Sequence, residues 1–357
     1  MPADAALALV SSRPTIAVDG QDAATLANGL LDLRIEEDVD GLYRCELDVG
    51  NWGPSGGTVG FLYFDRQTLD FGKRLEVKIG SDKLFDGKIT GLEARFPEGR
   101  PPTLTVLAED KLQDLRMTRR TRTFADSSDA DVCTSIASDH ALTPDVSVTG
   151  PTHKVLAQLN QSDLAFLRER ARAVGAEVWV ADTALSVKPR PSRSGGRLTL
   201  SYGRDLHEFT VLADLADQRS SVAVTGWDVS GKSALNERAD GSTVSSEVGD
   251  GDSGSRILGS ALAERNEVVS FSVPVTSDEA RAQAEALFRA RARRFVRGRG
   301  VADTSAALRV GATVTLEGLG PLFSGEFYVS HVTHRFDAVH GLRTEFRAER
   351  PGLGRAA

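Results

Sequence analysis

Several features that would point to secretion, membrane insertion or covalent catalysis are scarce in this 357-residue sequence. It has only two cysteines, Cys45 and Cys133, which form no framework of the secreted type, so reduced thiols are expected. No apolar run approaches the length of a membrane span. Residues 1–10 lack both a basic start and the long apolar stretch of a signal peptide. These absences predict synthesis in the cytoplasm and no direct membrane insertion.

Positive charge is also in deficit. The chain has 43 Lys and Arg against 50 Asp and Glu, a net charge of −7, which argues against nucleic acid as a general partner. Its 40% hydrophobic and 26% charged residues are ordinary for a globular protein. The length suffices for two or more domains with sizeable cores.

Signals of enzyme chemistry are missing as well. The six histidines show no metal-ligand spacing on a helix, and His331 and His334 should point to opposite faces of a strand. The segment 250–254 resembles a calcium loop only faintly, because a third acidic ligand and the closing glutamate are absent. There is no G-x-S-x-G elbow, no cysteine in a nucleophile context and no distinctive carboxylate pair. The sequence therefore predicts a non-enzyme with no catalytic, cofactor-binding or metal-binding residues.

One phosphate-loop pattern is present. Residues 226–233, Gly-Trp-Asp-Val-Ser-Gly-Lys-Ser, match G-x-x-x-x-G-K-[ST] from Gly226 to Ser233. Phosphate binding needs such a loop to leave a buried parallel strand and open a helix. Residues 234–241 have one apolar anchor before a glycine- and serine-rich tract, so no helix is expected there. A nucleotide-binding protein is the alternative function that this match raises, and a chance match is the preferred interpretation.

Short runs in which apolar and polar residues alternate dominate the chain, and this period of two is typical of half-buried strands. Turn-forming residues separate the runs, for example at 97–102 and 318–321. This pattern predicts antiparallel barrels or sandwiches. The runs lie at 75–79, 103–106, 197–200, 221–224, 269–273 and 313–316.

Three segments have the pattern of helices. Ser128 and Ser162 are expected N-caps of the first two, and Gly175 is placed for a left-handed turn after the second. Thr276 caps the third, predicted over 277–297, whose buried face is Ala284, Phe288, Ala292 and Phe295 and whose end is set by Gly298 and Gly300. Residues 177–188 predict a hairpin. Residues 231–256, rich in Gly, Ser, Asp and Glu, predict a long mobile hairpin tip.

Arginines recur along this third predicted helix. Arg289, Arg293 and Arg297 are four residues apart, so they should form one exposed stripe opposite the buried face. A solvated helix surface accounts for such a stripe, and a docking face for an acidic neighbouring subunit is the functional alternative. These three residues are the candidate interaction surface.

Several segments resemble one protein family. Residues 158–171, Gln-Leu-Asn-Gln-Ser-Asp-Leu-Ala-Phe-Leu-Arg-Glu-Arg-Ala, followed by Gly175, resemble a signature of the phage late-control-D and VgrG baseplate hubs. Residues 84–91 resemble that family's strand with the pattern F-x-G-x-I. The closing segments 308–314 and 325–329, with His334, Thr344, Phe346 and Arg350, resemble its C-terminal pattern. The similarity runs in order over about residues 5–350.

The resemblance implies a mainly β fold with α/β insertions and two similar antiparallel β-barrels. Three copies of a family hub close into a pseudo-sixfold ring. Such a homotrimer is a symmetry adaptor that joins the hexameric inner tube to the trimeric central spike of a contractile injection machine, with tube-initiator and other baseplate proteins as further partners. VgrG-type proteins continue into a needle, whereas this sequence stops shortly after Arg350, so the spike is expected to be a separate chain.

The expected division is a first barrel at 1–125, an inserted α/β domain at 126–190 and a second barrel at 191–357. A hub of a non-contractile phage tail is an alternative to the contractile machine. A peptidoglycan hydrolase is a third class, but no lytic domain or acid–base pair supports it. The expected location is a phage tail or an extracellular injection particle, and the sequence does not distinguish a secretion system from these.

Overall fold

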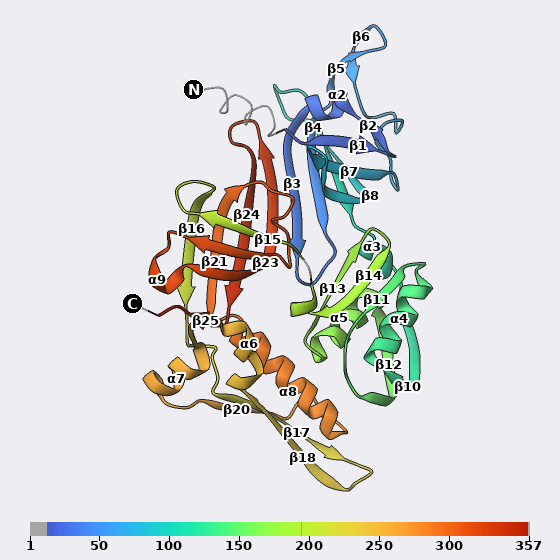
Figure 1. Cartoon of the computed structure of the whole chain (residues 1–357). Helices are drawn as coiled ribbons and strands as arrows, with labels where there is room; N and C mark the ends of the chain where they lie inside the picture. The colour runs from blue at the N-terminus through green and yellow to red at the C-terminus, as the bar shows by residue number, and fades with distance from the viewer. Residues whose placement is uncertain (1–12, 194, 356–357) are drawn as a thin grey trace.

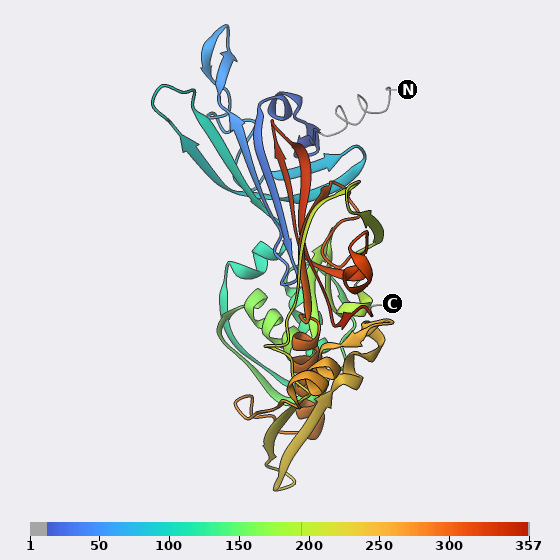
Figure 2. The same cartoon turned by 90° about the vertical axis from the view of Figure 1, so that its left-hand side faces the viewer.

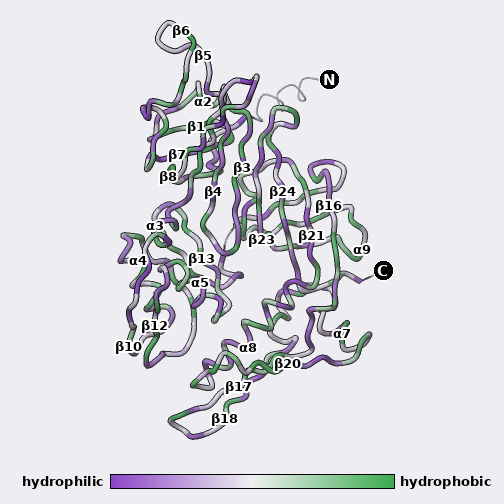
Figure 3. Tube along the Cα trace, turned by 180° about the vertical axis from the view of Figure 1, so that it is seen from behind, coloured by the Kyte–Doolittle hydropathy of each residue, from purple (hydrophilic) through white to green (hydrophobic). Residues whose placement is uncertain are grey.

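The computed structural model describes residues 13–193 and 195–355, so the expectations about residues 1–10 lie outside the described residues. The chain is mainly β, and its strands run through an elongated molecule (Figures 1 and 2). In the described residues, thirteen strands form one sheet with the order β16-β21-β24-β23-β3-β4-β9-β8-β7-β1-β2, in which β22 also pairs with β23 and β15 pairs with β22. All pairs in this sheet are antiparallel except β15 with β22. Hydrophobic and hydrophilic residues alternate along its strands (Figure 3).

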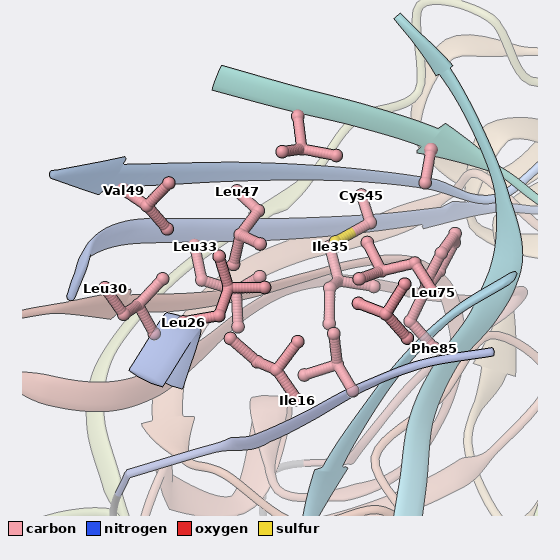
Figure 4. Packing of buried hydrophobic residues seen from close by; sticks show 14 of the residues in the cluster. Ile16, Leu26, Leu30, Leu33, Ile35, Cys45, Leu47, Val49, Leu75 and Phe85 are labelled. Carbon is pink, nitrogen blue, oxygen red and sulfur yellow. The ribbon is translucent and has the colours of Figure 1, made fainter. Parts of the chain in front are cut away.

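The N-terminal part of the sheet encloses its own core. Leu33, Ile35, Leu47 and Leu75 are fully buried there, and Figure 4 shows these side chains pointing into one apolar cluster. A separate ribbon of two strands, β5 and β6, projects from this part. Its elements are β1 (Thr15–Val18), β2 (Gln21–Asp22), α2 (Ala24–Asn28), β3 (Leu30–Asp38), β4 (Arg44–Gly50), β5 (Trp52–Ser55), β6 (Thr58–Phe61), β7 (Arg74–Ile79), β8 (Asp82–Arg95), β9 (Thr103–Glu109) and α3 (Leu112–Arg116).

The middle segment has a second core and small sheets of its own. Strand β10, which spans the expected domain limit at 125, pairs only with β12, and β14 pairs with β11 and β13. The predicted hairpin at 177–188 is confirmed as β13–β14. The elements are β10 (Arg119–Ser128), α4 (Asp129–Asp139), β11 (Thr143–Val146), β12 (Thr152–Ser162), α5 (Asp163–Ala173), β13 (Ala176–Ala181), β14 (Ala184–Pro189) and η1 (Arg190–Ser192).

The C-terminal part of the large sheet contains a third core, in which Phe327, Val329 and Phe346 are buried. Strand β23 pairs with β24 on one side and with β3 of the N-terminal part on the other. The two ends of the chain therefore share one sheet. The elements are β15 (Arg197–Ser201), β16 (Leu206–Ala213), β21 (Val296–Asp303), β22 (Thr313–Glu317), α9 (Gly320–Phe323), β23 (Gly325–Asp337), β24 (Gly341–Arg350) and β25 (Gly352–Leu353).

Residues 221–292 form a smaller unit at the end of the molecule opposite the β5–β6 ribbon (Figure 1). Its three-stranded sheet has the order β18-β17-β20, and helix α8 packs on one face through Ala284 and Phe288. The elements are β17 (Ser221–Asp228), β18 (Ser233–Asp240), η2 (Gly241–Val244), α6 (Ser245–Val248), β19 (Asp252–Ser253), α7 (Gly254–Leu262), β20 (Asn266–Val269) and α8 (Ser277–Ala292). Within the described residues, no helix is both long and apolar enough to cross a membrane.

The predicted helix starts are confirmed. Ser128 and Asp131 form a complete capping box, and the Ser162 and Thr276 side chains accept hydrogen bonds from the expected backbone N–H groups. Gly175 has the predicted left-handed backbone, with φ of 69°. Local capping chemistry is readable from sequence because cap and partner lie within three residues of each other.

The predicted end of the third helix is wrong. Helix α8 ends at Ala292 rather than at 297, and residues 296–303 form strand β21. The glycines assigned as helix terminators lie inside this strand. A Cβ at Gly298 would lie 2.1 Å from the ring of Phe209, so the absence of a side chain lets that ring lie directly on β21.

The predicted long mobile hairpin tip at 231–256 is also wrong. Only residues 229–232 form the turn of the β17–β18 hairpin, while the rest contains β18, η2, α6, β19 and the start of α7. Val244 is fully buried against α8. Although residues 231–256 are mostly polar, one or two apolar side chains fix their short helices to α8.

Candidate functional site

The phosphate-loop pattern lies in an antiparallel hairpin. Gly226 pairs with Leu235 and Asp228 pairs with Ser233 across β17 and β18. The Asp228 carboxylate accepts hydrogen bonds from the backbone N–H groups of Ser230 and Gly231, which closes the turn. No helix follows Lys232, so this loop lacks the helix N-terminus that would bind phosphate groups.

The three candidate arginines do not form one exposed helical stripe. Arg289 lies on α8 and donates to Glu285 at 2.9 Å, but Arg293 is the buried C-cap residue and donates two hydrogen bonds of 2.7 Å to Glu247. Arg297 lies on β21, because the helix has already ended. The stripe prediction failed because it extended helical spacing into a strand. The buried Arg293 fixes α6 to α8 and is not available to a partner.

His331 and His334 of β23 and Cys133 of α4 differ in their burial. His331 is partly exposed, while His334 is fully buried beside Thr344, which confirms that they occupy opposite faces. Burial lowers the pKa of His334 to about 4, so its ring is neutral near pH 7. Burial raises the pKa of the Cys133 thiol to about 12. In 13–193 and 195–355, no group of three His, Cys, Asp or Glu side chains could hold a metal ion.

The signature at 158–163 builds a buried polar cluster, here called the Asp163 cluster: Asp163, His140, Arg120, Arg122 and Gln158. The Asp163 carboxylate accepts hydrogen bonds from three side chains, each with a donor–acceptor distance of 2.8 Å. The donor atoms are His140 Nε2, Arg122 Nη2 and Gln158 Nε2. Burial alone would raise the pKa of Asp163, but the hydrogen bonds from His140 and Gln158 and the nearby arginine charges hold it below its usual value. The contacts of Asp163 therefore fix α5, β10 and β12 together.

A second carboxylate joins the middle segment to α8. The Asp129 carboxylate accepts a hydrogen bond of 2.6 Å from Arg170 Nε. Its other oxygen lies 3.5 Å from His153 Nε2. The other ring nitrogen of His153 is 3.8 Å from Glu279, which lies in the first turn of α8. This chain of contacts ties two units that are more than one hundred residues apart in sequence.

Residues from all parts of the large sheet and the middle segment meet around a third carboxylate. This Glu177 junction consists of Glu177, Arg190, Arg193, Tyr43, Tyr328 and Glu349. Glu177 accepts hydrogen bonds from Arg193 at 2.8 Å and Arg190 at 3.1 Å, and also from the hydroxyl of Tyr328. Arg190 donates onward to Glu349 at 2.7 Å.

Aromatic rings complete the junction. Arg193 lies over Trp179 with its guanidinium carbon 4.5 Å from the ring centre, and Arg190 lies over Tyr328 at 4.0 Å. Burial raises the pKa of Tyr328 above its usual value, so the hydroxyl stays protonated and donates to Glu177. Removing one member of such a buried ionic network costs about 3–5 kcal/mol, because the remaining charges cannot reach water. The junction is therefore a structural lock between parts of the chain.

A cavity of about 600 Å³ adjoins this junction, between β3, β8, β13 and residues 306–310. Its charged lining is largely paired internally: Glu37 with Arg309, and Asp86 with Arg74 and Lys83. Asp110 also lines it and accepts the backbone N–H groups of Tyr43 and Leu112, each at 2.9 Å. Burial raises the pKa of Asp110 to about 7 in spite of these two bonds. Among the described residues that line the cavity there is no Ser, Thr, Cys or His side chain.

Comparison with known families decides the classification. The sequence profile described as the Alg8 N-terminal domain matches residues 10–338. The chain belongs to the Alg8 N-terminal domain family. That description names no activity, so membership carries no functional statement by itself. A comparison of this chain with curated proteins found no match.

Solved structures share the fold of this Alg8 N-terminal domain family member. The 43 kDa tail protein of prophage MuSo2 from Shewanella oneidensis has a TM-score of 0.68 at 12% identity, covering 95% of this chain and 98% of that protein. A tail protein from Neisseria meningitidis MC58 has a TM-score of 0.65 at 14% identity, with 94% and 96% coverage.

The E. coli c3393 protein has a TM-score of 0.58 at 12% identity, with 92% of this chain and 76% of that protein covered. It is described as a component of the type VI secretion system that is structurally similar to the T4 bacteriophage tail proteins gp27 and gp5. The expected likeness to phage tail and secretion-system proteins is thereby confirmed at the level of the fold.

Proposed function

We propose that this chain is the structural hub of a contractile injection machine, in which three copies join a hexameric inner tube to a trimeric central spike. The observation that carries the proposal is the match of nearly the whole chain to nearly the whole length of two phage tail proteins. A structural role needs no catalytic group, and the buried carboxylates of this chain act as internal locks. We propose no enzymatic activity.

The arrangement of cores supports two barrel modules per chain. The N-terminal and C-terminal parts of the large sheet each surround a separate apolar cluster, and strands β3 and β23 join them edge to edge. The proposed division is a first barrel at 1–125, an inserted domain at 126–190 and a second barrel at 191–357. Three copies would then present six barrel modules to a sixfold tube and a threefold face to the spike.

The proposed partners are further copies of this chain, a spike protein, and the inner tube or tube-initiator proteins with other baseplate subunits. The proposed location is an assembled phage tail or extracellular injection particle. The net charge of −7 supports protein rather than nucleic acid as the partner class.

Light scattering coupled to size-exclusion chromatography tests the proposal. The purified chain, alone and with its spike protein, is expected to reach a mass three times that of one copy. Electron microscopy of the same fraction should show a threefold ring with a central channel. A chain that stays monomeric at every concentration, with and without the spike, would contradict the hub.

A further inference from the structure

The N-terminal and C-terminal parts of the large sheet repeat one plan. In chain order, β1, β3, β4, β7, β8 and β9 of the first part correspond to β15, β16, β21, β22, β23 and β24 of the second. Each pairing in the first set has a counterpart in the second: β1–β7 matches β15–β22, β3–β4 matches β16–β21, β4–β9 matches β21–β24, β7–β8 matches β22–β23, and β8–β9 matches β23–β24. One pairing differs in direction, since β1 is antiparallel to β7 and β15 is parallel to β22. Strands at equivalent places in the two parts can therefore be compared directly.

Bulges fix the comparison of β8 with β23 residue by residue. Thr90 interrupts the register between β8 and β9, and Ser330 interrupts the register between β23 and β24. The hydroxyl groups of both residues donate hydrogen bonds of 3.4 Å to a carbonyl oxygen of the opposite strand. Counting from these bulges, residues 91–97 correspond to residues 331–337.

A second pair of bulges does the same for β3 and β16. Leu31 interrupts the register between β3 and β4, and His207 interrupts the register between β16 and β21. Counting from these residues, 32–38 correspond to 208–214. The registers of β4 with β9 and of β21 with β24 agree with both comparisons.

Two of these four edges are joined within the chain, and two are open. Residues 331–337 of β23 pair antiparallel with residues 32–38 of β3, and this contact is here called the β3–β23 joint. The counterparts of these edges are residues 91–97 and 208–214. Among the described residues, the strands in these two segments pair only with β9 and with β21, respectively, and β16 lies at the outer edge of the C-terminal part (Figure 1). Each part therefore has one edge in the joint and one edge free.

The burial of equivalent side chains differs between the joint and the open edges. In the β3–β23 joint, Phe336 is 5% exposed and its partner Leu33 is fully buried. Their counterparts are Phe96, just after β8, which is 65% exposed, and Phe209 of β16, which is only partly buried. Each open edge therefore leaves uncovered an apolar side chain that a neighbouring strand covers in the joint.

We propose that β16 of one copy of this chain pairs antiparallel with residues 91–97 of the next copy, in the manner of the β3–β23 joint. Copying the register of that joint places Glu93 of the next copy opposite Leu212. It also places Phe96 of the next copy opposite Phe209. Because the contact joins two different edges, it repeats head to tail and closes into a ring. The inference rests on the proposed function, which supplies three copies, and it adds which edges meet and in which register.

The side chains at the two edges suit this register. Phe96 and Leu212, which is 53% exposed, would both be covered by the neighbouring strand. No like charges come directly opposite each other, and Arg95 of one copy lies diagonal to Glu208 of the other. Pairing would also satisfy the backbone groups that an open edge leaves to solvent.

Disulfide trapping tests the register in the full chain. Glu93→Cys and Leu212→Cys are placed in one chain, and the trimer, alone or with its spike protein, is oxidised mildly. Residues directly opposite in antiparallel strands have Cα atoms about 4.5–5.5 Å apart, which a disulfide can bridge. The expected product is a covalent trimer with no larger species, because the native Cys45 and Cys133 are buried.

The matched control combines Glu93→Cys with Glu208→Cys. Glu208 is also exposed on β16, but the register puts it four positions from Leu212, roughly 13 Å along the strand. The cross-linked yield of the control should be at least about tenfold lower, since this separation exceeds the reach of a disulfide.

A charge substitution tests the same contact without a covalent bond. Leu212→Glu places like charges opposite each other, so the concentration at which half of the trimer dissociates should rise at least about fivefold in sedimentation experiments. Adding Glu93→Arg should restore the trimer, which a folding defect would not allow. Both side chains are exposed, so the thermal midpoint of the isolated chain should not change.

Each outcome has a distinct meaning. A trimer in which the substituted positions 93 and 212 fail to cross-link, or in which the control pair cross-links equally well, would overturn the strand pairing and leave the hub intact. Cross-linking that stops at a dimer bridged twice would show a twofold contact and would overturn the head-to-tail arrangement. A chain that stays monomeric at every concentration, with and without the spike, would overturn the hub and the pairing with it.

Discussion

The Asp163 cluster and the Glu177 junction are both buried carboxylates held by arginines, but their partners come from different distances along the chain. All members of the Asp163 cluster lie between residues 120 and 163, inside the middle segment. Glu177 instead gathers Arg190 and Arg193 with Tyr328, and Arg193 reaches on to Tyr43. One arrangement stabilises a unit, and the other fixes units to one another.

The arginines also differ in their access to water. Arg120 and Arg122 have side chains that are 40% and 24% exposed, so they can turn to solvent if the carboxylate is lost. Arg193 is only 3% exposed, so it has no such alternative. The comparison indicates that equal numbers of ionic contacts need not have equal energetic importance.

The largest effect is expected for Glu177→Gln. The substitution leaves two buried guanidinium groups without their shared carboxylate, so the free energy of unfolding should fall by about 3–5 kcal/mol. Urea denaturation followed by circular dichroism measures this change. A loss below about 1 kcal/mol would show that the junction does not lock the units.

Asp163→Asn should have a smaller effect. The amide keeps the size of the side chain and one acceptor, and the partly exposed arginines can be solvated, so a loss of about 1–3 kcal/mol is expected. The same denaturation experiment serves, with Glu177→Gln as the reference. A loss as large as that of Glu177→Gln would erase the contrast between the two sites.

The smallest expected effect, when it is expressed per unit of pH, is a pH dependence that arises beside the junction. Asp110 has a pKa of about 7 in the fold and a usual value of 3.8, so the folded state binds the proton more tightly than the unfolded state. Its contribution to stability is complete below pH 3.8 and is lost as the pH rises toward 7. The slope approaches about 1.4 kcal/mol per pH unit at most between these values.

Asp110→Asn should remove this slope. Thermal midpoints of the wild type and the variant, measured from pH 5 to 8, should diverge because only the wild type loses stability on the alkaline side. Asp145→Asn is the control, since hydrogen bonds from Lys188 and Ser186 hold the pKa of Asp145 below its usual value and no histidine contacts it in the described part of the chain. Parallel pH profiles for wild type and Asp110→Asn would contradict the assignment.

Features set by neighbouring residues could be predicted from the sequence. The caps at Ser128 and Ser162 and the left-handed Gly175 follow from chemistry within a few positions. The signature at 158–163 was recognised as a segment, but its purpose became visible only when His140 and Arg122 were placed beside Asp163. Rules based on neighbouring residues locate such motifs, but they do not identify the distant side chains that the motifs contact.

Features set by distant residues could not be predicted. Helical spacing placed Arg293 and Arg297 on one face, yet residues 296–303 form a strand that pairs with β16 and β24, both distant in sequence. Alternation predicted a strand over 269–273, but β20 ends at Val269 and the chain bends at 271–272, although its partner β17 continues to Asp228. Nothing near Glu177 in the sequence indicates that Tyr43 and Tyr328 belong to its junction.

The pairing of β3 with β23 has a consequence for biosynthesis. Asp38 of β3 and His331 of β23 are partners separated by 293 positions, so almost the entire polypeptide must be synthesised before β3, which pairs with β4 on its other side, gains its second neighbour. A prematurely terminated product would expose that strand edge and invite aggregation. A chain that stops before β23 cannot join the N-terminal and C-terminal parts of the large sheet, so closure of this sheet depends on synthesis of residues 325–337.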